Sequence, residues 1–185
     1  MLVALLTGGA HAQSLDPGPP GPFVVDVRGV TAGLPADGGL YPGAAVGGTV
    51  PSRGLGVGVG GHIYVLPVGA VRLGLGVEAT LVRGTGTDAD LELGIVSPVL
   101  SLNFGTADGW SYLSAGVGAA RVRPSPGTSL TVRALAVGGG ARWFPWPHVG
   151  VGFDLRLHRL AGGTRDLTAL PSTTLLSAGV GLSLK

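Results

Sequence analysis

The sequence predicts an all-β fold, an eight-stranded antiparallel up-and-down transmembrane β-barrel formed by residues 13–185. Three observations predict it: strict alternation of aliphatic residues with small or polar ones, eight segments long enough to cross a bilayer, and connections that alternate between long and short. The composition agrees, because 36 of the 185 residues are glycine, 45% are hydrophobic and only 12% are charged. Glycine at this density disfavours helical bundles, and the apolar content argues against a disordered chain.

Other features of the composition exclude further classes. The chain has no cysteine, so it has neither a disulfide scaffold nor a thiolate metal site. The formal net charge of +2 is too small and too diffuse to indicate a nucleic-acid partner. Mean hydropathy is +0.47, yet glycine, proline and arginine interrupt every apolar stretch before it reaches the length of a membrane helix. Because lipid admits only helices and closed barrels, this combination favours a barrel.

The amino-terminal residues 1–12 are expected to be a signal peptide, truncated at its amino end. A short apolar run at 2–6 precedes Ala10, His11 and Ala12, where two small residues flank a bulkier one as in a signal-peptidase site. Cleavage before Gln13 would leave an exported barrel domain. The alternative is that this run is an ordinary apolar strand.

Alternation defines the first three strands. The strand at 22–30 places Asp26 and Arg28 on one face and valines on the other. The strand at 53–66 alternates aliphatic residues with glycine from Leu55 onward, and the strand at 70–83 continues the pattern. A period of two puts each set of residues on one face of a strand.

Five more strands complete the predicted barrel. The strand at 96–105 is the weakest, because Pro98 interrupts it and because Leu91, Leu93 and Ile95 alternate out of step with the residues from Leu100 onward. A β-bulge or an extended hairpin arm above the bilayer would explain that shift. The other four are expected at 109–122, 130–143, 148–159 and 173–184.

The predicted connections alternate in length along the chain. Short turns at one rim and long loops at the other are typical of antiparallel membrane barrels, and an even strand number puts both termini at the rim with the short turns. The long first loop, rich in glycine, proline and alanine, is a candidate contact or adhesion surface whose composition names no partner. The connections are expected at 31–52, 67–69, 84–95, 106–108, 123–129, 144–147 and 160–172.

The face that looks inward follows from the glycine content. A soluble barrel fills its interior with bulky apolar residues and rarely leaves an outer face made mostly of glycine. In a membrane barrel the order is inverted, with apolar residues outside and polar ones inside. Small residues on the inner face of a narrow barrel leave room for a few large charged side chains. We therefore expect the aliphatic rows to face lipid.

The expected lumen is charged but nearly neutral. A buried charge is tolerable only when it is paired, so we expect an ion-pair network at mid-depth built from Asp26, Arg28, Glu78, Asp154 and Arg156. It would act as a polar plug or, less favoured, as the gate of a narrow pore, and its near-neutral balance argues against a strongly ion-selective channel. The inward residues expected are Asp26, Arg28, Arg72, Glu78, Arg142, Asp154 and Arg156, with His62, Tyr64 and His158.

Aromatic residues collect at or beside the three short turns. Trp and Tyr favour the membrane–water interface, and membrane barrels carry them as girdles. The alternative is that they cap turns in a soluble sandwich. The interfacial girdle is expected to comprise Tyr64, Phe104, Trp110, Tyr112, Trp143, Phe144 and Trp146.

Four segments carry a family resemblance: 101–105 (SLNFG), 108–112 (DGWSY), 150–156 (GVGFDLR) and 178–184 (AGVGLSL). With them the chain resembles the small eight-stranded outer-membrane barrels, that is, the OmpA-like transmembrane domain and the outer membrane protein β-barrel domain group. The resemblance implies a Gram-negative cell outer membrane, contact with outer-membrane lipid and lipopolysaccharide, and insertion by the barrel assembly machinery. Such barrels usually end in an aromatic residue, whereas this chain ends in Leu184 and Lys185.

Catalytic signals are weak, and neither an enzyme, a cofactor nor a metal site is expected. Gly56, Gly58 and Gly61 form a G-x-G-x-x-G pattern inside an alternating strand, with no helix after it to bind a dinucleotide. The histidines are too scattered for metal ligation. His158 has no serine beside it in the sequence, as a nucleophile–base pair would need. Three classes stay open: a structural or slightly leaky outer-membrane barrel, a lipid-modifying enzyme on that scaffold, and a secreted soluble barrel that binds an apolar ligand.

Overall fold

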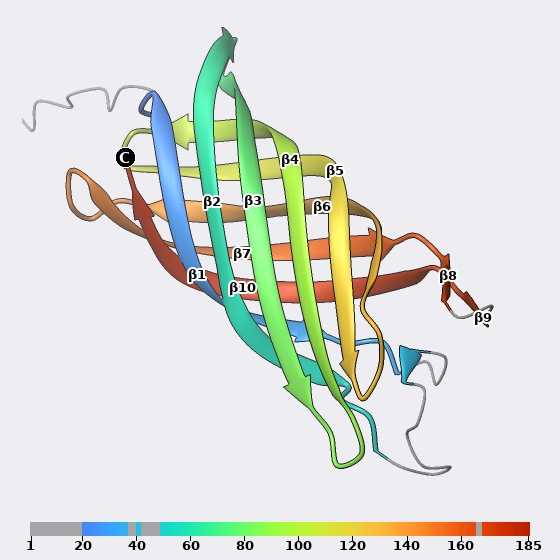
Figure 1. Ribbon diagram of the computed structural model, residues 1–185. Helices are drawn as coiled ribbons and strands as arrows, with labels where there is room; N and C mark the ends of the chain where they lie inside the picture. The colour runs from blue at the N-terminus through green and yellow to red at the C-terminus, as the bar shows by residue number, and fades with distance from the viewer. Residues whose placement is uncertain (1–19, 37–39, 42–48, 166–167) are drawn as a thin grey trace, which may run out of the picture.

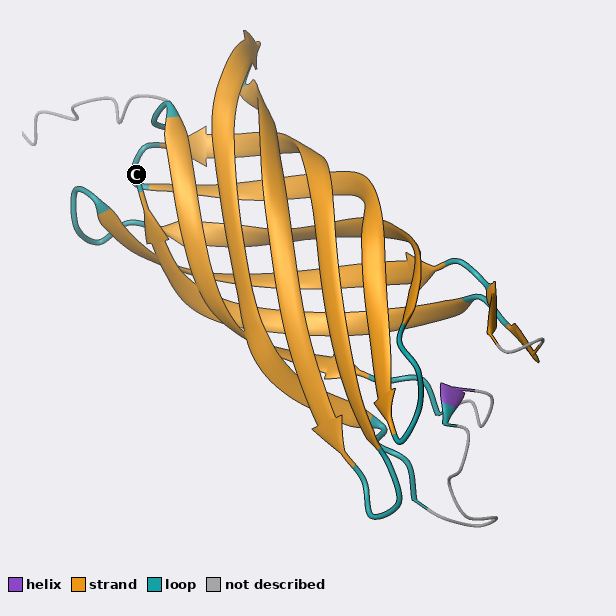
Figure 2. Cartoon of the chain, in the orientation of Figure 1, coloured by secondary structure: helices purple, strands orange, loops and turns teal. Residues whose placement is uncertain are grey.

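The computed structural model describes residues 20–36, 40–41, 49–165 and 168–185, and eight long antiparallel strands close into a single barrel (Figures 1 and 2). The order around the barrel is β1-β10-β7-β6-β5-β4-β3-β2, so each strand pairs with its neighbour in the chain and β1 closes on β10. The predicted fold class is confirmed. The barrel strands are β1 (Phe23–Gly33), β2 (Arg53–Val68), β3 (Val71–Thr85), β4 (Asp90–Thr106), β5 (Gly109–Ser125), β6 (Leu130–Trp143), β7 (Val149–Leu160) and β10 (Thr173–Leu184).

The two ends of the barrel differ in their connections. At the terminal rim β1 begins and β10 ends, with Val25 paired to Leu184, and the short turns 69–70, 107–108 and 144–148 lie there. At the loop rim lie the four other connections, 34–52, 86–89, 126–129 and 161–172. The expected signal peptide lies outside the described residues.

Two of the predicted long loops are wrong in length. β3 and β4 remain paired as far as Thr85 and Asp90, so the connection expected at 84–95 is only the turn 86–89. β5 likewise continues to Ser125, which leaves the turn 126–129. The extended β3–β4 hairpin is the arm that the sequence offered as one explanation for the weak fourth strand.

The other explanation, a bulge in the fourth strand, is wrong. β4 keeps one register with β3 along its whole length, and the irregular pairing lies in β2 between Tyr64 and Leu66. Leu91, Leu93 and Ile95 point inward in unbroken alternation with the outward residues of β4. The aliphatic residues change face because the inside of the barrel is itself apolar near the loop rim.

The connection 161–172 contains a feature that the sequence did not reveal. β8 (Gly163–Arg165) and β9 (Thr168–Leu170) pair as a small two-stranded sheet beside the barrel (Figure 1). Strands of three residues are too short to display a period of two, so alternation could not predict them.

Below the loop rim the outer wall is aliphatic, and the charged side chains at that depth lie inside. Val117 is 61% exposed and Val180 is 68% exposed, whereas Asp154 and Arg156 are each 4% exposed. This is the expected orientation, in which aliphatic rows face outward and the glycine and charged rows face the lumen. No helix in the described part of the chain is long and apolar enough to span a membrane.

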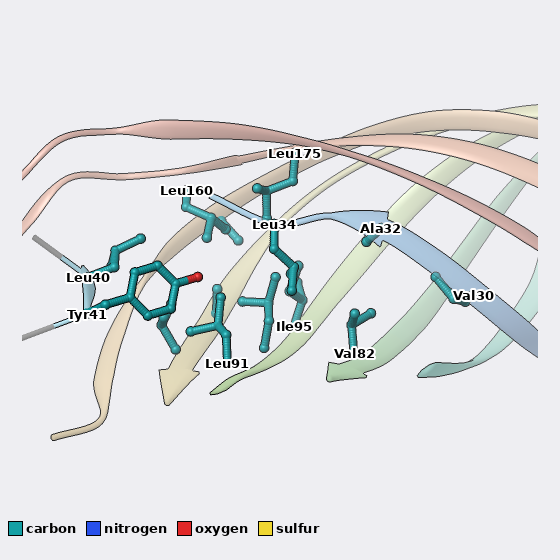
Figure 3. Packing of buried hydrophobic residues seen from close by; sticks show 14 of the residues in the cluster. Val30, Ala32, Leu34, Leu40, Tyr41, Val82, Leu91, Ile95, Leu160 and Leu175 are labelled. Atoms are coloured by element: carbon teal, nitrogen blue, oxygen red, sulfur yellow. The ribbon is translucent and has the colours of Figure 1, made fainter. Parts of the chain in front are cut away.

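Inside the barrel, apolar side chains pack at both ends. A large cluster near the loop rim joins Leu91, Leu160 and Leu175 to Leu40 and Tyr41 of the first loop (Figure 3). A small aromatic cluster of Val24, Trp110, Phe144 and Tyr64 lies at the terminal rim. The charged side chains occupy the layer between these clusters.

Candidate functional site

The candidate site is a network of buried ion pairs in the lumen. Asp26 of β1 and Arg142 of β6 form its first part through two parallel hydrogen bonds: Arg142 Nε donates to Asp26 Oδ1 over 2.9 Å and Nη2 donates to Oδ2 over 2.6 Å. Ser183 Oγ donates to the same Oδ1 over 2.6 Å. The guanidinium also lies 4.0 Å from the ring centre of Tyr112. A bidentate, charge-assisted pair of this kind fixes both side chains in position.

The second part of the network connects four charged residues in a row. Arg28 donates to Asp154 Oδ2, and Arg156 Nε donates to the same oxygen over 2.7 Å. Arg156 also pairs with both carboxylate oxygens of Glu78, with Nη2 and Oε1 2.7 Å apart. Asp154 thus bridges two arginines, and Arg156 bridges two carboxylates, so that each charge has an opposite charge beside it.

Neutral polar groups complete the network. His62 Nε2 lies 3.1 Å from Glu78 Oε1, and the hydroxyl of Tyr112 donates to Asp154 Oδ2 over 3.4 Å. Arg156 Nη1 donates to Ser114 Oγ over 3.4 Å. Within this network, Arg28 Nε and His62 Nδ1 are the described buried side-chain atoms that have no hydrogen-bond partner. Most polar atoms are therefore satisfied within the protein.

The charges of the network balance. Its three arginines, Arg28, Arg142 and Arg156, face the three carboxylates of Asp26, Glu78 and Asp154. Arg72, which the sequence also placed on the inward face, lies apart: it is half-buried, and its Nη1 donates to the carbonyl of Pro20 over 2.8 Å. Arg142, which the sequence placed among the lumenal charges, is the main partner of Asp26.

Glycine makes room for the large side chains. A Cβ atom at Gly138 would lie 2.7 Å from Cγ of Arg156 and 2.5 Å from the carbonyl oxygen of Leu155. At Gly60 a Cβ atom would touch Glu78, Arg28 and Asp26, all at 3.4–3.8 Å. The glycine rows in the sequence therefore correspond to the space that the arginines and carboxylates fill.

Little empty space is left inside. A void of about 10 Å³ adjoins Asp26, Arg28 and Arg142, and one of about 20 Å³ lies near the loop rim between Leu40 and Leu91. A cavity needs about 10–15 Å³ to hold one water molecule. Among the described residues, these two lumenal spaces are therefore water-sized at most.

The predicted aromatic girdle needs correction. Phe104, Trp143 and Trp146 are exposed on the outside near the terminal rim, as expected. Four others, Tyr64, Trp110, Tyr112 and Phe144, point into the lumen. Proximity to a short turn correctly predicted that these aromatic residues lie near the terminal rim. Whether each one faces the lumen or the outside depends on its odd or even position along the strand.

The inward aromatics pack against one another at the terminal end of the barrel. Trp110 is 2% exposed and stacks on Phe144, with ring centres 4.7 Å apart and planes at 15°. Tyr64 packs edge-on against Trp110 at 5.9 Å. The Lys185 ammonium lies 4.2 Å from the Phe144 ring centre. These rings cover the lumen at this rim.

The structure brings together one pair that the sequence did not reveal. His158 Nε2 lies 3.2 Å from Ser177 Oγ, although no serine adjoins His158 along the chain. The two residues come from neighbouring strands, where Ser177 lies diagonally across from His158. Both side chains are buried inside the barrel, and His158 Nδ1 has no hydrogen-bond partner to orient the ring. The pair thus has the spacing of a nucleophile and a base but neither an orienting acid nor an open approach.

Comparison with known proteins identifies the fold as that of small outer-membrane barrels. The chain is similar to the crystal structure of Neisserial surface protein A, with a TM-score of 0.61 and 15% identity over 89% of this chain and 97% of that one. It is also similar to the outer membrane protein OprG from Pseudomonas aeruginosa, with a TM-score of 0.53 and 12% identity over 91% and 97% of the two chains. The outer membrane enzyme PagL matches with a TM-score of 0.51 and 14% identity over 88% and 99%.

At this identity the likeness shows the fold alone. No family model matches the sequence, and no curated protein matches it either. The structural neighbours include a surface protein and an enzyme, so they do not decide between a catalytic and a non-catalytic role.

Proposed function

We propose that the chain is an integral outer-membrane barrel with a structural role, whose lumen is closed by a charged plug between two apolar layers. One observation carries the proposal: aliphatic side chains cover the outer wall below the loop rim, while the charged side chains at the same depth are buried inside and pair with one another. An aliphatic outer wall requires a lipid environment, because in water this large apolar surface would be exposed to solvent.

The same observation weighs against a secreted soluble barrel. Such a protein would bury its aliphatic rows and expose the charges at mid-depth, whereas here the aliphatic rows are exposed and the mid-depth charges are buried. An outer-membrane location is supported by the neighbours of known structure and by the side of the wall that is apolar.

The layered lumen supports a closed state. The aromatic cluster at the terminal rim, the balanced ion pairs at mid-depth and the apolar cluster at the loop rim each cross the interior, and the voids among them are about 10 and 20 Å³. A conducting pore requires a continuous water-filled path, and an ion-selective pore requires a ring of one charge sign. Neither feature is present among the described lumenal residues.

A planar-bilayer conductance measurement tests this function. The wild-type barrel, checked for folding by heat-modifiable gel migration, is expected to give no channel current. A variant with Trp110→Ala and Arg156→Ala, which thins two of the three layers, is expected to conduct. Leu157→Ala, which shortens an outward side chain next to Arg156, is the matched control and is expected to stay silent. Steady channels in the wild-type protein would overturn the closed lumen.

The His158–Ser177 pair suggests a lipid-modifying activity as the alternative function. Because both residues are enclosed, we expect His158→Ala and Ser177→Ala to leave the lipid profile of the host membrane unchanged. A changed profile in both variants, with normal barrel folding, would replace the structural role by an enzymatic one.

A further inference from the structure

Charged residues on the outer wall of the barrel are confined to one end. On β2, β3, β5, β6 and β7 the outward-facing aliphatic row stops at the loop rim, and the next outward residue is an arginine. At the terminal rim, the outward strand positions that the structure describes carry no charged residue, and several are apolar or aromatic, such as Phe23, Phe104 and Leu184. The outward arginines at the loop rim are Arg53, Arg83, Arg121, Arg123, Arg133 and Arg159.

Five of these arginines form two groups with different partners. Arg83 and Arg123 flank Glu92 of β4, with nitrogen–oxygen distances of 2.7 and 2.8 Å, so one carboxylate serves both. Arg121, Arg133 and Arg159 lie on the consecutive strands β5, β6 and β7, and all three are exposed. We call these last three residues the arginine triad.

The strand register makes the triad a continuous patch. Arg133 pairs with Ala119, two residues before Arg121, and Arg159 pairs with Leu135, two residues after Arg133. Each arginine is thus a diagonal neighbour of the next, at a backbone separation of roughly 7–8 Å, which long side chains can span. The triad follows the edge of the aliphatic wall.

Among the residues that the structure describes, no carboxylate pairs with the triad. The one hydrogen bond of its guanidinium groups to a side chain among the described residues is from Arg121 Nη2 to Ser129 Oγ, over 3.5 Å. No outward carboxylate is present on β5, β6 or β7, and Glu92, the nearest on β4, is already engaged by Arg83 and Arg123. Three like charges side by side repel one another unless an anion joins them.

We propose that the arginine triad binds the phosphate groups of a phosphorylated lipid in the membrane leaflet at the loop rim. The inference rests on the proposed membrane location, because there the aliphatic wall fixes the depth of the patch. Each arginine of the triad lies two residues beyond the last aliphatic residue on the outer face of its strand, so its side chain reaches the headgroup layer. There the planar guanidinium groups bind phosphate oxygens in bidentate fashion. A soluble anion would not require the patch to adjoin the apolar wall.

The test compares two triple variants of equal net charge. Arg121→Gln/Arg133→Gln/Arg159→Gln removes the triad, and Arg53→Gln/Arg83→Gln/Arg123→Gln removes three other arginines of the same rim. Each folded barrel, in neutral detergent, is titrated with a diphosphorylated disaccharide lipid, and native mass spectrometry counts the bound lipids. We expect the triad variant to lose affinity on the order of a hundredfold and the other variant to lose much less.

Three controls keep the outcomes distinct. The dephosphorylated form of the lipid is expected to bind both variants and the wild type equally weakly. Equal losses in the two variants would overturn the triad as a site, and inhibition of lipid binding by millimolar inorganic phosphate alone would reassign it to a soluble anion. Insertion of all three proteins into phosphatidylcholine vesicles is measured separately, and failure of the wild type there would refute the proposed membrane location rather than the triad.

Discussion

Arg142 of β6 and Asp26 of β1 are separated by 116 positions in the sequence, yet two parallel hydrogen bonds of 2.9 and 2.6 Å join them across the inside of the barrel. Each strand is also held by its own neighbours in the wall. The pair therefore adds a connection through the lumen to a barrel that is already closed at its edge. The pair links β1 to β6 through the lumen, and it stabilises the barrel only when both charges are present.

Removal of one member of this pair is expected to be costly. Asp26→Asn leaves the Arg142 guanidinium buried with a neutral partner, and breaking a buried pair in this way costs about 3–5 kcal/mol. Urea unfolding in detergent micelles measures the change. Asp108→Asn, in an exposed turn of the terminal rim, is the control and is expected to stay within about 0.5 kcal/mol. Adding Arg142→Met to Asp26→Asn should restore much of the loss, and a double variant as unstable as the sum of the singles would contradict the pairing.

The aromatic closure predicts a contrast between two tryptophans at the same rim. Trp110 is buried between Tyr64 and Phe144, so Trp110→Ala is expected to cost about 3–5 kcal/mol. Trp146 is 59% exposed in the turn 144–148, and Trp146→Ala should change the stability of the micelle-bound barrel by less than about 1 kcal/mol. The temperature at which the folded band disappears in gels reports both. Similar shifts for the two variants would mean that the inward cluster does not exist.

Lumenal glycine is expected to be less replaceable than glycine on the outer wall. Gly138→Ala forces a Cβ atom against the Leu155 carbonyl and Arg156, with a cost of about 1–3 kcal/mol and a lower folding yield. Gly61→Ala is the matched control, since a Cβ atom there meets nothing within 4 Å. Refolding yield from urea into micelles distinguishes them. A Gly138→Ala barrel that refolds as well as the control would show that the lumen is less tightly filled than described.

Tyr41 predicts a response to alkaline pH at the loop rim. Its hydroxyl donates to the Pro35 carbonyl over 2.9 Å, and burial raises the pKa of Tyr41 from 10.0 to about 12. The stability that this residue contributes is therefore present below pH 10 and is lost as the pH rises through about 12. The difference in phenolate absorbance between wild type and Tyr41→Phe should have its midpoint near pH 12. A midpoint near 10 would place Tyr41 in water, away from the apolar cluster.

Sequence reasoning succeeded where the signal was a period of two. It predicted eight strands, the outward aliphatic rows and the inward positions of Asp26, Arg28, Glu78, Asp154 and Arg156, because strand parity alone determines which face a residue occupies. The prediction was wrong where it used the closeness of a residue to a turn, instead of its odd or even position along the strand, to assign the face of the side chain. Trp110 and Tyr112 share the inward parity of Ser114, yet their position beside a turn made them appear interfacial.

Contacts across the lumen could not be predicted, because they depend on the stagger of the strands. The sequence gives no reason to pair Asp26 with Arg142, or His158 with Ser177, until the register is known. The length of β3 and β4 was underestimated for a different reason. Leu91 and Leu93 pack inside the barrel near the loop rim, so the alternation of faces continues, but there the aliphatic side chains face inward instead of outward.

The account rests on which face of each strand meets lipid, and a cysteine scan of β5 tests this most directly. The chain has no cysteine of its own, so single cysteine substitutions at Leu113, Ala115 and Val117 carry one spin label each, and Ser114→Cys supplies a nearly isosteric, unlabelled inward thiol. In phosphatidylcholine vesicles, labels at Leu113, Ala115 and Val117 should be accessible to oxygen dissolved in the lipid and protected from water-soluble nickel reagents, whereas the thiol of Ser114→Cys should react with neither lipid-soluble nor water-soluble thiol reagents. The reverse alternation, or uniform access of the nickel reagent along the strand, would contradict the lipid-facing aliphatic wall.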